Sequence, residues 1–362
     1  MSLKREWPLL ASAGTAAAFF VFRSQLLGDI DNAWWAAFVF AWLFGVILWS
    51  AFAVVRHSEC LAVLTGEPVG TLVLTLAVTA IEVMMIAAVM LTGPPVSPLA
   101  RDAMYAVIMI VCNGLVGLAL LVGALRYHEQ TYNLQAANAY LAVIVPLAVL
   151  GLILPNFTES SQGPTLSTLH EGFLVFISLA LYTVFLAIQT QRHRQYFLPA
   201  DEVIDAHAGR EPRSALYHAS FLIAYMVPIV LLSKQIALPI EFGVHVFGAP
   251  AALVGFAVAA LVLAPESLAA VRAARADQLQ RAINLLLGSV LASISLTIPA
   301  VLAIGLVTDR VVVLGLNPID TIMLALTLGL SMLTFASGRS NVLLGAVHLV
   351  MFFAYLLLIF ER

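Results

Sequence analysis

Charged residues are scarce in this sequence. Asp, Glu, Lys and Arg make up 10% of the 362 residues, whereas soluble domains carry about a quarter. The 17 basic residues form no block that could neutralise the phosphates of a nucleic acid. Because 62% of the residues are hydrophobic, the composition excludes a soluble domain and a nucleic-acid partner and indicates a polytopic protein of the lipid bilayer.

Cysteine is equally rare. Cys60 and Cys112 are too few and too far apart for a disulfide framework or a metal cluster. The sequence also lacks a Ser/His/Asp set, a His-x-x-x-His pair and a glycine-rich phosphate loop. These absences argue against an intramembrane enzyme and an ATP-driven pump, and no cofactor is predicted.

Long apolar runs are what the sequence has in abundance. Eleven of them approach the ~20 residues of a membrane-spanning helix. They lie at about 8–27, 33–55, 68–92, 103–125, 136–154, 171–189, 216–233, 246–271, 281–307, 312–335 and 341–360. The first run follows basic residues, but it shows no clear small-residue cleavage site, so we predict a transmembrane helix rather than a signal peptide.

The distribution of basic residues predicts the orientation. With a cytoplasmic N-terminus, most of the 17 Lys and Arg residues fall on the cytoplasmic side, and the C-terminus lies outside. The longest polar connection divides the chain into a leading helix at 1–32, a first five-helix repeat at 33–190, a cytoplasmic loop at 191–215 and a second five-helix repeat at 216–362. An odd number of spans per repeat makes the repeats enter the membrane in opposite directions. We therefore predict an all-α polytopic fold of about eleven transmembrane helices with inverted-topology repeats.

Each repeat carries one acidic residue inside the apolar run of its second span, Glu82 in the first and Glu266 in the second. An ionised carboxylate at the bilayer centre costs at least ~2.5 kcal/mol, so such residues usually mark an ion pathway. Two carboxylates that face each other would form a hard oxygen site for Ca²⁺ or alkali cations. The alternatives are a structural hydrogen bond for Glu82 and an interfacial ion pair of Glu266 with Arg272 or Arg275.

The residues beside the two glutamates could complete such a site. Thr79 lies one turn before Glu82 and offers a hydroxyl oxygen. Pro265, directly before Glu266, predicts a helix break, because proline removes one backbone hydrogen bond and frees a carbonyl that a cation could satisfy. Since the same carboxylates bind protons, cation and proton would compete, and this competition predicts antiport.

The third span of each repeat places small polar side chains within hydrocarbon: Asn113 in the first, and Ser289 and Ser293 in the second. Their amide and hydroxyl oxygens could bind a cation or a proton. Alternatively, they hold neighbouring helices together, which is a common use of small polar residues in membranes.

Titratable residues also gather outside these spans. Those at the junctions after the first span of each repeat are His57, Glu59, Glu67, Lys234, Glu241 and His245. We expect solvated junctions there, with ion entry or gating through Glu59, Glu67, Glu241 and His245 as the alternative. Histidines of the central connection can titrate near neutral pH, although we expect them to lie in an exposed linker: His193, His207 and His218.

Three parts of the sequence resemble the bacterial Cha-type calcium/proton antiporters of the calcium/cation antiporter superfamily. They are the acidic spans, "ARDAMYAVIMIVCNGLVGLALLVGALRYHEQTYN" at 100–133, and the stretch at 248–305 that contains "GAPAALVGFAVAALVLAPESLAAVRAA" and "LQRAINLLLGSVLASISLTIPAVLAIG". The resemblance covers essentially the whole chain. It implies eleven helices, arranged as one leading helix and two inverted five-helix repeats. It also implies exchange of cytoplasmic cations for external protons, with Ca²⁺ as the named substrate and Na⁺ and K⁺ also reported for the type.

The superfamily signature, Gly-Asn-x-x-Glu in each repeat, matches in part. Its glutamates fall on Glu82 and Glu266, whereas its asparagines fall on Thr79 and Leu263. A Gly-Ser pair frequent in the following helix matches residues 288–289. With two amide oxygens fewer, the resemblance implies a site that could accept monovalent ions besides Ca²⁺.

These observations predict a secondary active cation/proton antiporter of the bacterial inner (plasma) membrane. We expect Ca²⁺/H⁺ exchange by alternating access. A Na⁺(K⁺)/H⁺ antiporter with weak Ca²⁺ selectivity and, from another class, a cation channel are the alternatives. The expected partners are inorganic cations, protons and the lipid bilayer, and the sequence leaves the oligomeric state open.

Overall fold

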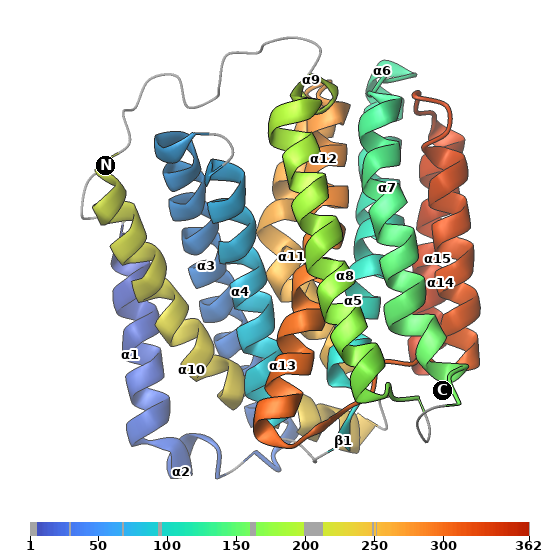
Figure 1. Ribbon diagram of the computed structural model, residues 1–362. Coiled ribbons are helices and arrows are strands. Elements are labelled where there is room, and N and C mark those ends of the chain that lie inside the picture. Colours follow the sequence, from blue (N-terminus) through green and yellow to red (C-terminus); the bar gives the residue numbers. More distant parts are fainter. Residues whose placement is uncertain are drawn as a thin grey trace. The chain divides into compact units, whose positions relative to one another are not determined.

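The computed structural model describes residues 6–28, 30–66, 69–92, 96–159, 164–198, 213–247, 250 and 252–361, which are almost entirely helical (Figure 1). In this part of the chain, 9 helices are long and apolar enough to cross a membrane. Two shorter apolar helices, Trp7–Val21 and Pro318–Thr334, fall where the first and tenth spans were expected. The predicted all-α polytopic membrane fold is confirmed.

The chain forms two compact units that differ from the two halves defined by sequence. The first unit is Met1–Pro94 with Asp205–Pro265, and the second is Pro95–Ile204 with Glu266–Arg362. Each half therefore contributes its first spans to the first unit and its later spans to the second. Residues that are close in the sequence of one half can therefore belong to different compact units.

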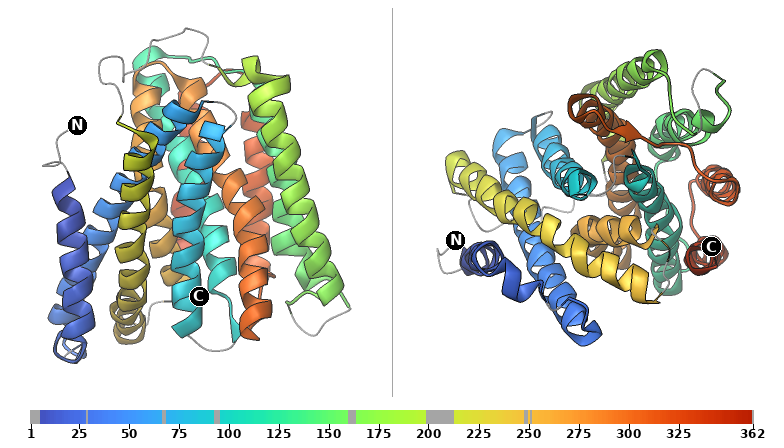
Figure 2. Two further views of the ribbon diagram at one scale, coloured as in Figure 1. Left: turned by 60° about the vertical axis from the view of Figure 1, so that its left-hand side comes forward. Right: turned by 90° about the horizontal axis from the view of Figure 1, so that it is seen from below.

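The first unit is built around two long helices. Its elements are α1 (Trp7–Val21), α2 (Arg23–Leu26), α3 (Ala33–Thr65), α4 (Val69–Thr92), α10 (Ala215–Phe247) and the first part of α11 (Ala252–Arg275). The Asn32 side chain begins α3 by accepting hydrogen bonds from the N–H groups of Trp34 and Trp35. Helix α10 packs along α3 and also contacts α4 and α1 (Figure 2).

The second unit contains the remaining helices, and several of its long spans include π-helical segments. Its elements are β1 (Val96–Ser97), α5 (Leu99–Ile108), η2 (Met109–Leu115), α6 (Val116–Tyr127), α7 (Leu134–Ala148), η3 (Val149–Ile153), η4 (Leu154–Asn156), α8 (Thr168–Ala187), η5 (Ile188–Arg192), α9 (Arg194–Phe197), the end of α11, α12 (Leu279–Ala292), η6 (Ser293–Thr297), α13 (Ile298–Thr308), β2 (Val311–Val312), α14 (Pro318–Thr334) and α15 (Val342–Phe360). The two short strands pair in parallel.

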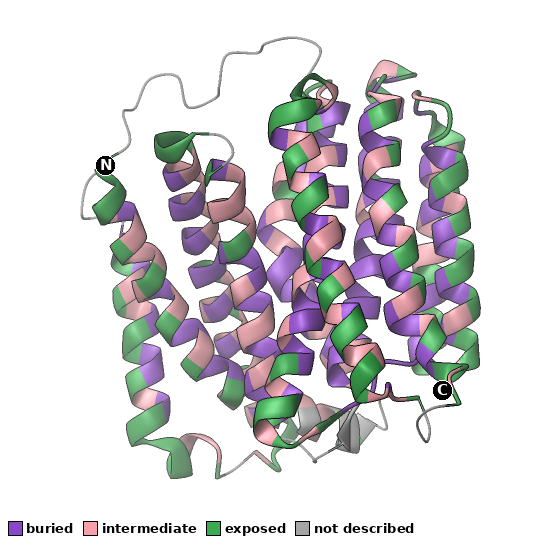
Figure 3. Cartoon of the chain, in the orientation of Figure 1, coloured by how far each residue is buried: buried purple, intermediate pink, exposed green. Residues whose placement is uncertain are grey.

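The span Leu99–Tyr127, made of α5, η2 and α6, is the core of the second unit. In its most apolar stretch 78% of the residues are buried, whereas Figure 3 shows α8 and α15 of the same unit with many exposed residues. Helix α15 packs closely on α6 and η2. A Cβ at Gly345 would lie 2.6 Å from the backbone nitrogen of Leu121, so this approach requires glycine, as is common between membrane helices.

Candidate functional site

Helix α4 of the first unit holds Glu82. The residue is 4% exposed, and Thr79, one turn earlier, is 5% exposed. The structure therefore buries both predicted ligands on the same helix. A carboxylate at such a depth is costly to keep in apolar surroundings, so Glu82 stays a candidate ligand.

Glu266 lies in α11, directly after Pro265. The predicted helix break is wrong, because α11 runs without interruption from Ala252 to Arg275 with Pro265 inside it. Pro265 has no N–H, so the carbonyl four residues earlier, on Leu261, lacks its usual helical donor. The boundary between the two compact units also falls between Pro265 and Glu266.

Ser289 of α12 donates a hydrogen bond to Oε2 of Glu266. The contact joins the second and third spans of the second half and lies entirely within the second unit. The sequence predicted both residues as part of one site, and the structure places them together. The hydroxyl group of Ser289 orients the carboxylate of Glu266, and its oxygen lies next to that carboxylate.

We expect Ser289→Ala to raise the cation concentration for half-maximal exchange about tenfold, because a hydrogen bond to a charged group contributes roughly 1.5–3 kcal/mol. The maximal rate should be retained. Concentration-dependent cation uptake into vesicles measures the effect, and Ser289→Thr, which keeps a hydroxyl, is the matched control. Equal half-saturation for Ser289→Ala and the unmodified protein would show that the hydrogen bond does not support binding.

π-Helical segments fall on the polar residues of the third span in each half. Asn113 lies in η2, and Ser293 begins η6. Both are buried, at 0% and 3% exposure. A π-helical segment displaces backbone hydrogen bonds from their α-helical pattern and is frequent at functional sites. The third span of each half thus contains a π-helical segment with a buried polar residue.

The polar groups in these segments are incompletely paired. Asn113 donates to Thr327 Oγ1 at 2.8 Å, but its Oδ1 is buried and has no hydrogen-bond partner among the described residues. The buried hydroxyls of Ser295 and Thr297 in η6 are likewise unpaired within the described chain. Unpaired buried oxygens are available to a ligand.

A polar stripe on α14 escaped the sequence analysis. Its members are all buried: Asp320, Thr327, Ser331 and Thr334. Thr327 contacts Asn113, and Thr334 Oγ1 lies 2.8 Å from Nε2 of the buried His348. Their helical spacing was a visible signal, but without an acidic residue at mid-span the stripe did not suggest a site.

Of the four predicted gating residues, only Glu59 has a side chain that the structure describes. Glu59 is half-buried on α3. Glu67 is outside the described residues, as are His207 and most of the 191–215 loop. Glu241 and His245 belong to α10, but their side chains lie outside the described part.

The expected solvated junction is wrong for His57, and the expected exposed linker is wrong for His218. Helix α3 continues to Thr65, well beyond the apolar run at 33–55, so His57 lies inside it. His218 is in the first turn of α10. They are 0% and 1% exposed and contact each other.

Glu82 and Glu266 belong to different compact units, so their pairing stays a prediction. Among the residues that the structure describes, His, Cys, Asp and Glu form no group of three that could hold a metal ion. The described spans also contain buried amide and hydroxyl oxygens, which are donor types that hard cations accept.

A buried carboxylate on a membrane-spanning helix, as Glu82 is on α4, is typical of proteins that move inorganic ions across a bilayer. Comparison of the sequence with protein families agrees. The model of the sodium/calcium exchanger protein family matches residues 35–191 and 217–361, and the chain belongs to this family. It is accordingly a secondary transporter rather than an enzyme, and the ions that such proteins exchange are substrates rather than cofactors.

Two bacterial relatives share much of the sequence. The chain is 42% identical over 316 residues to a "putative ionic transporter y4hA" of Sinorhizobium fredii, covering 87% of this chain and 86% of the relative. It is 40% identical over 319 residues to the "sodium-potassium/proton antiporter ChaA" of Escherichia coli, with coverage of 87% and 86%.

Solved structures share the fold. Native YfkE matches with a TM-score of 0.75 at 16% identity, covering 98% of this chain and 99% of YfkE. The H⁺/Ca²⁺ exchanger CAX matches with a TM-score of 0.67 at 13% identity, covering 98% of this chain and 89% of CAX. At these identities the comparison establishes the fold.

Proposed function

We propose that this chain exports a cytoplasmic cation in exchange for protons by alternating access, and that Ca²⁺ is its principal cation. The observation that carries the proposal is the repeated arrangement of a carboxylate in one span and a π-helical polar segment in the next. Glu82 and Glu266 are the residues that bind the cation or protons. The other oxygens come from side chains of the same spans: Thr79, Asn113, Ser289 and Ser293.

Ca²⁺ fits this donor set because it takes ~6–8 oxygen ligands in flexible geometry. Two ionised carboxylates would balance its charge. Protons compete for the same oxygens, so a site that has released its cation can return carrying protons. Cation export and proton import are then coupled without a further group, because the cation and the protons occupy one site in turn.

Na⁺ and K⁺ are the second candidate substrates, and two observations favour them. Thr79 and Leu263 stand where the superfamily signature has asparagines, which reduces the number of oxygens. The relative ChaA, 40% identical to this chain, is named a sodium-potassium/proton antiporter. A site with fewer oxygens discriminates less strongly in favour of a divalent ion.

The proposed topology is a leading helix at 1–32, repeats at 33–190 and 216–362, and a cytoplasmic loop at 191–215. Support comes from the family model, which matches the chain twice, at 35–191 and 217–361. With eleven spans the N-terminus is cytoplasmic and the C-terminus outside. The bacterial relatives support a location in the inner membrane of a bacterium.

Uptake driven by a pH gradient into inverted membrane vesicles tests this function. We expect an acidic vesicle interior to drive uptake of Ca²⁺, and this uptake should dissipate the pH gradient. If Na⁺ and K⁺ are substrates, they should be taken up and dissipate the pH gradient in the same way. Vesicles without the protein are the control. Cation uptake that ignores the pH gradient would indicate a channel and contradict antiport.

A further inference from the structure

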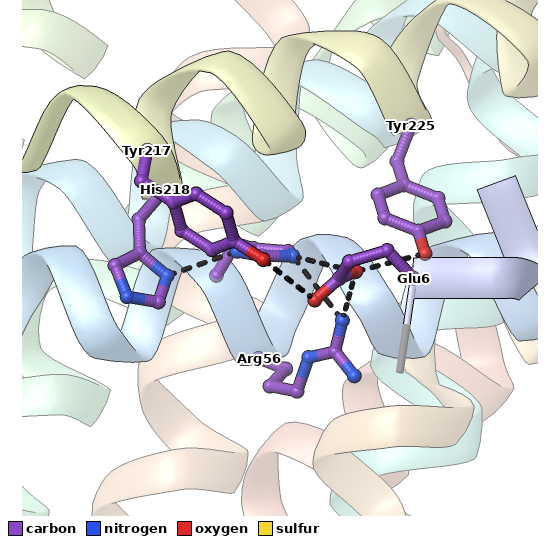
Figure 4. A network of polar contacts seen from close by, with 6 residues as sticks. Glu6, Arg56, Tyr217, His218 and Tyr225 are labelled. Atoms are coloured by element: carbon purple, nitrogen blue, oxygen red, sulfur yellow. Dashed lines mark hydrogen bonds and ion pairs between the residues drawn. The ribbon is translucent and has the colours of Figure 1, made fainter. Parts of the chain in front are cut away.

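A buried polar cluster in the first unit is centred on Glu6, the residue before α1 (Figure 4). Its Oε2 accepts hydrogen bonds from Arg56 Nη2 at 2.6 Å and Tyr225 Oη at 3.1 Å. The same oxygen lies 3.3 Å from Nε2 of His57. The Glu6 side chain is 4% exposed and that of His57 is 0% exposed. The cluster thus joins the start of α1 to α3 and α10.

His57 of α3 and His218 of α10 face each other within this cluster. Their Nδ1 atoms are 2.9 Å apart, so a hydrogen bond between the rings requires a proton on one Nδ1 and none on the other. His218 is 1% exposed, and its Nε2 has no hydrogen-bond partner among the described residues. The hydrogen bond between the two histidines therefore depends on how many protons the pair carries.

The protonation states of the two rings can be followed one proton at a time. With both neutral, either ring can donate through Nδ1 and the bond forms. One added proton is accommodated, because a fully protonated His57 donates Nδ1–H to His218 and Nε2–H to Glu6. A second added proton puts an N–H on both facing Nδ1 atoms and two positive charges side by side, which breaks the bond.

The charged and titratable groups in contact around the pair are Glu6 at the start of α1, Arg56 on α3, Tyr217 and Tyr225 on α10, and Arg213 stacked over Tyr217 at 4.7 Å. Of the helices that pack there, α3 also carries Glu59, and α4 carries Glu82 as its ionisable residue. Burial opposes ionisation of Glu6, but Arg56 and the hydrogen bond with His57 hold the pKa of its carboxyl below the ordinary value. Glu6 therefore stays negative where histidines titrate.

We propose that Glu6, His57 and His218 form a regulatory proton-binding site, separate from the transport carboxylates. While the site holds at most one extra proton, the hydrogen bond between His57 and His218 connects α3 to α10. This hydrogen bond breaks when the site binds a second proton. Exchange therefore falls when the side of the membrane nearest the cluster becomes acidic. The fall of exchange in acid rests on the proposed antiport function. The existence of the proton-binding site does not depend on that function.

Inverted vesicles expose the predicted cytoplasmic side to the medium, so medium pH can be varied at a constant pH gradient. We expect exchange to fall by about tenfold per pH unit below the second titration step of the pair, because the fraction of sites without the second proton falls about tenfold per pH unit. In His218→Gln the amide keeps a hydrogen bond to His57 but takes no proton, so the acid fall should disappear. His193→Gln is the control and should follow the unmodified protein. Identical profiles for His218→Gln and the unmodified protein would overturn the regulatory role.

NMR of ¹⁵N-histidine-labelled protein tests the proton site without transport. We expect the two rings to titrate in two steps at least about one pH unit apart, because the second proton must break their hydrogen bond. In His218→Gln, His57 should titrate in a single step. Two independent titrations near ~6.5 would overturn the site. If the vesicles exchange no cation, the proposed function fails, and the NMR result still decides the site.

Discussion

Glu82→Gln and Glu266→Gln are each expected to reduce cation/proton exchange by about 100-fold or more. Glutamine keeps the size of the side chain but neither balances a cation nor binds a proton. Removing one partner of a buried charge interaction costs roughly 3–5 kcal/mol, which corresponds to at least ~100-fold in binding. Uptake into inverted vesicles, driven by a pH gradient, measures the loss for each variant separately.

A matched control for these variants is Glu129→Gln. Glu129 is an exposed carboxylate, 60% accessible, that lies 3.7 Å from Arg339. Its neutralisation should leave exchange within about twofold of the unmodified protein, since exposed ion pairs contribute little. If Glu82→Gln or Glu266→Gln exchanged cations as fast as this control, that glutamate would have to be removed from the transport site.

Gly345→Ala is expected to cause a large loss of stability in the second unit. The added Cβ would lie 2.6 Å from Leu121 N and 2.9 Å from Gly117 O, both of which are backbone atoms of α6. Backbone atoms cannot rotate away, so α15 must move from α6. We expect a cost of about 3 kcal/mol or more, seen as a lower thermal unfolding midpoint in detergent.

Gly329→Ala on α14 is the control for this substitution. Nothing lies within 4 Å of the position where its Cβ would be, and alanine favours a helix over glycine by ~1 kcal/mol. Its unfolding midpoint should be unchanged or slightly higher. An equal midpoint for Gly345→Ala and Gly329→Ala would show that α15 and α6 do not pack as closely as described.

Helix number and the acidic spans could be predicted from local sequence alone. Apolar length determines whether a segment can span a bilayer, and a lone carboxylate in such a segment is conspicuous because of its cost. The predicted ends were less accurate where a helix continues through polar residues: α3 extends to Thr65 and α10 to Phe247, although their apolar runs end near residues 55 and 233.

Some features of the candidate site had no local signal. The π-helical segments at Asn113 and Ser293 arise from a change in backbone hydrogen bonding that no residue type specifies. The helix through Pro265 continues because surrounding protein tolerates the missing N–H, and a proline alone does not reveal whether such support exists.

The sequence by itself determined that this is a helical membrane protein with a carboxylate inside one span of each half, because hydrophobicity and charge act locally along the chain. Only the tertiary structure decided which polar groups meet. His57 and His218 are 161 residues apart, and Glu6 carried no signal beyond its charge. Their contact follows from the packing of α10 along α3, and burial then makes the Nδ1 atom of each histidine depend on the other ring for its hydrogen bond.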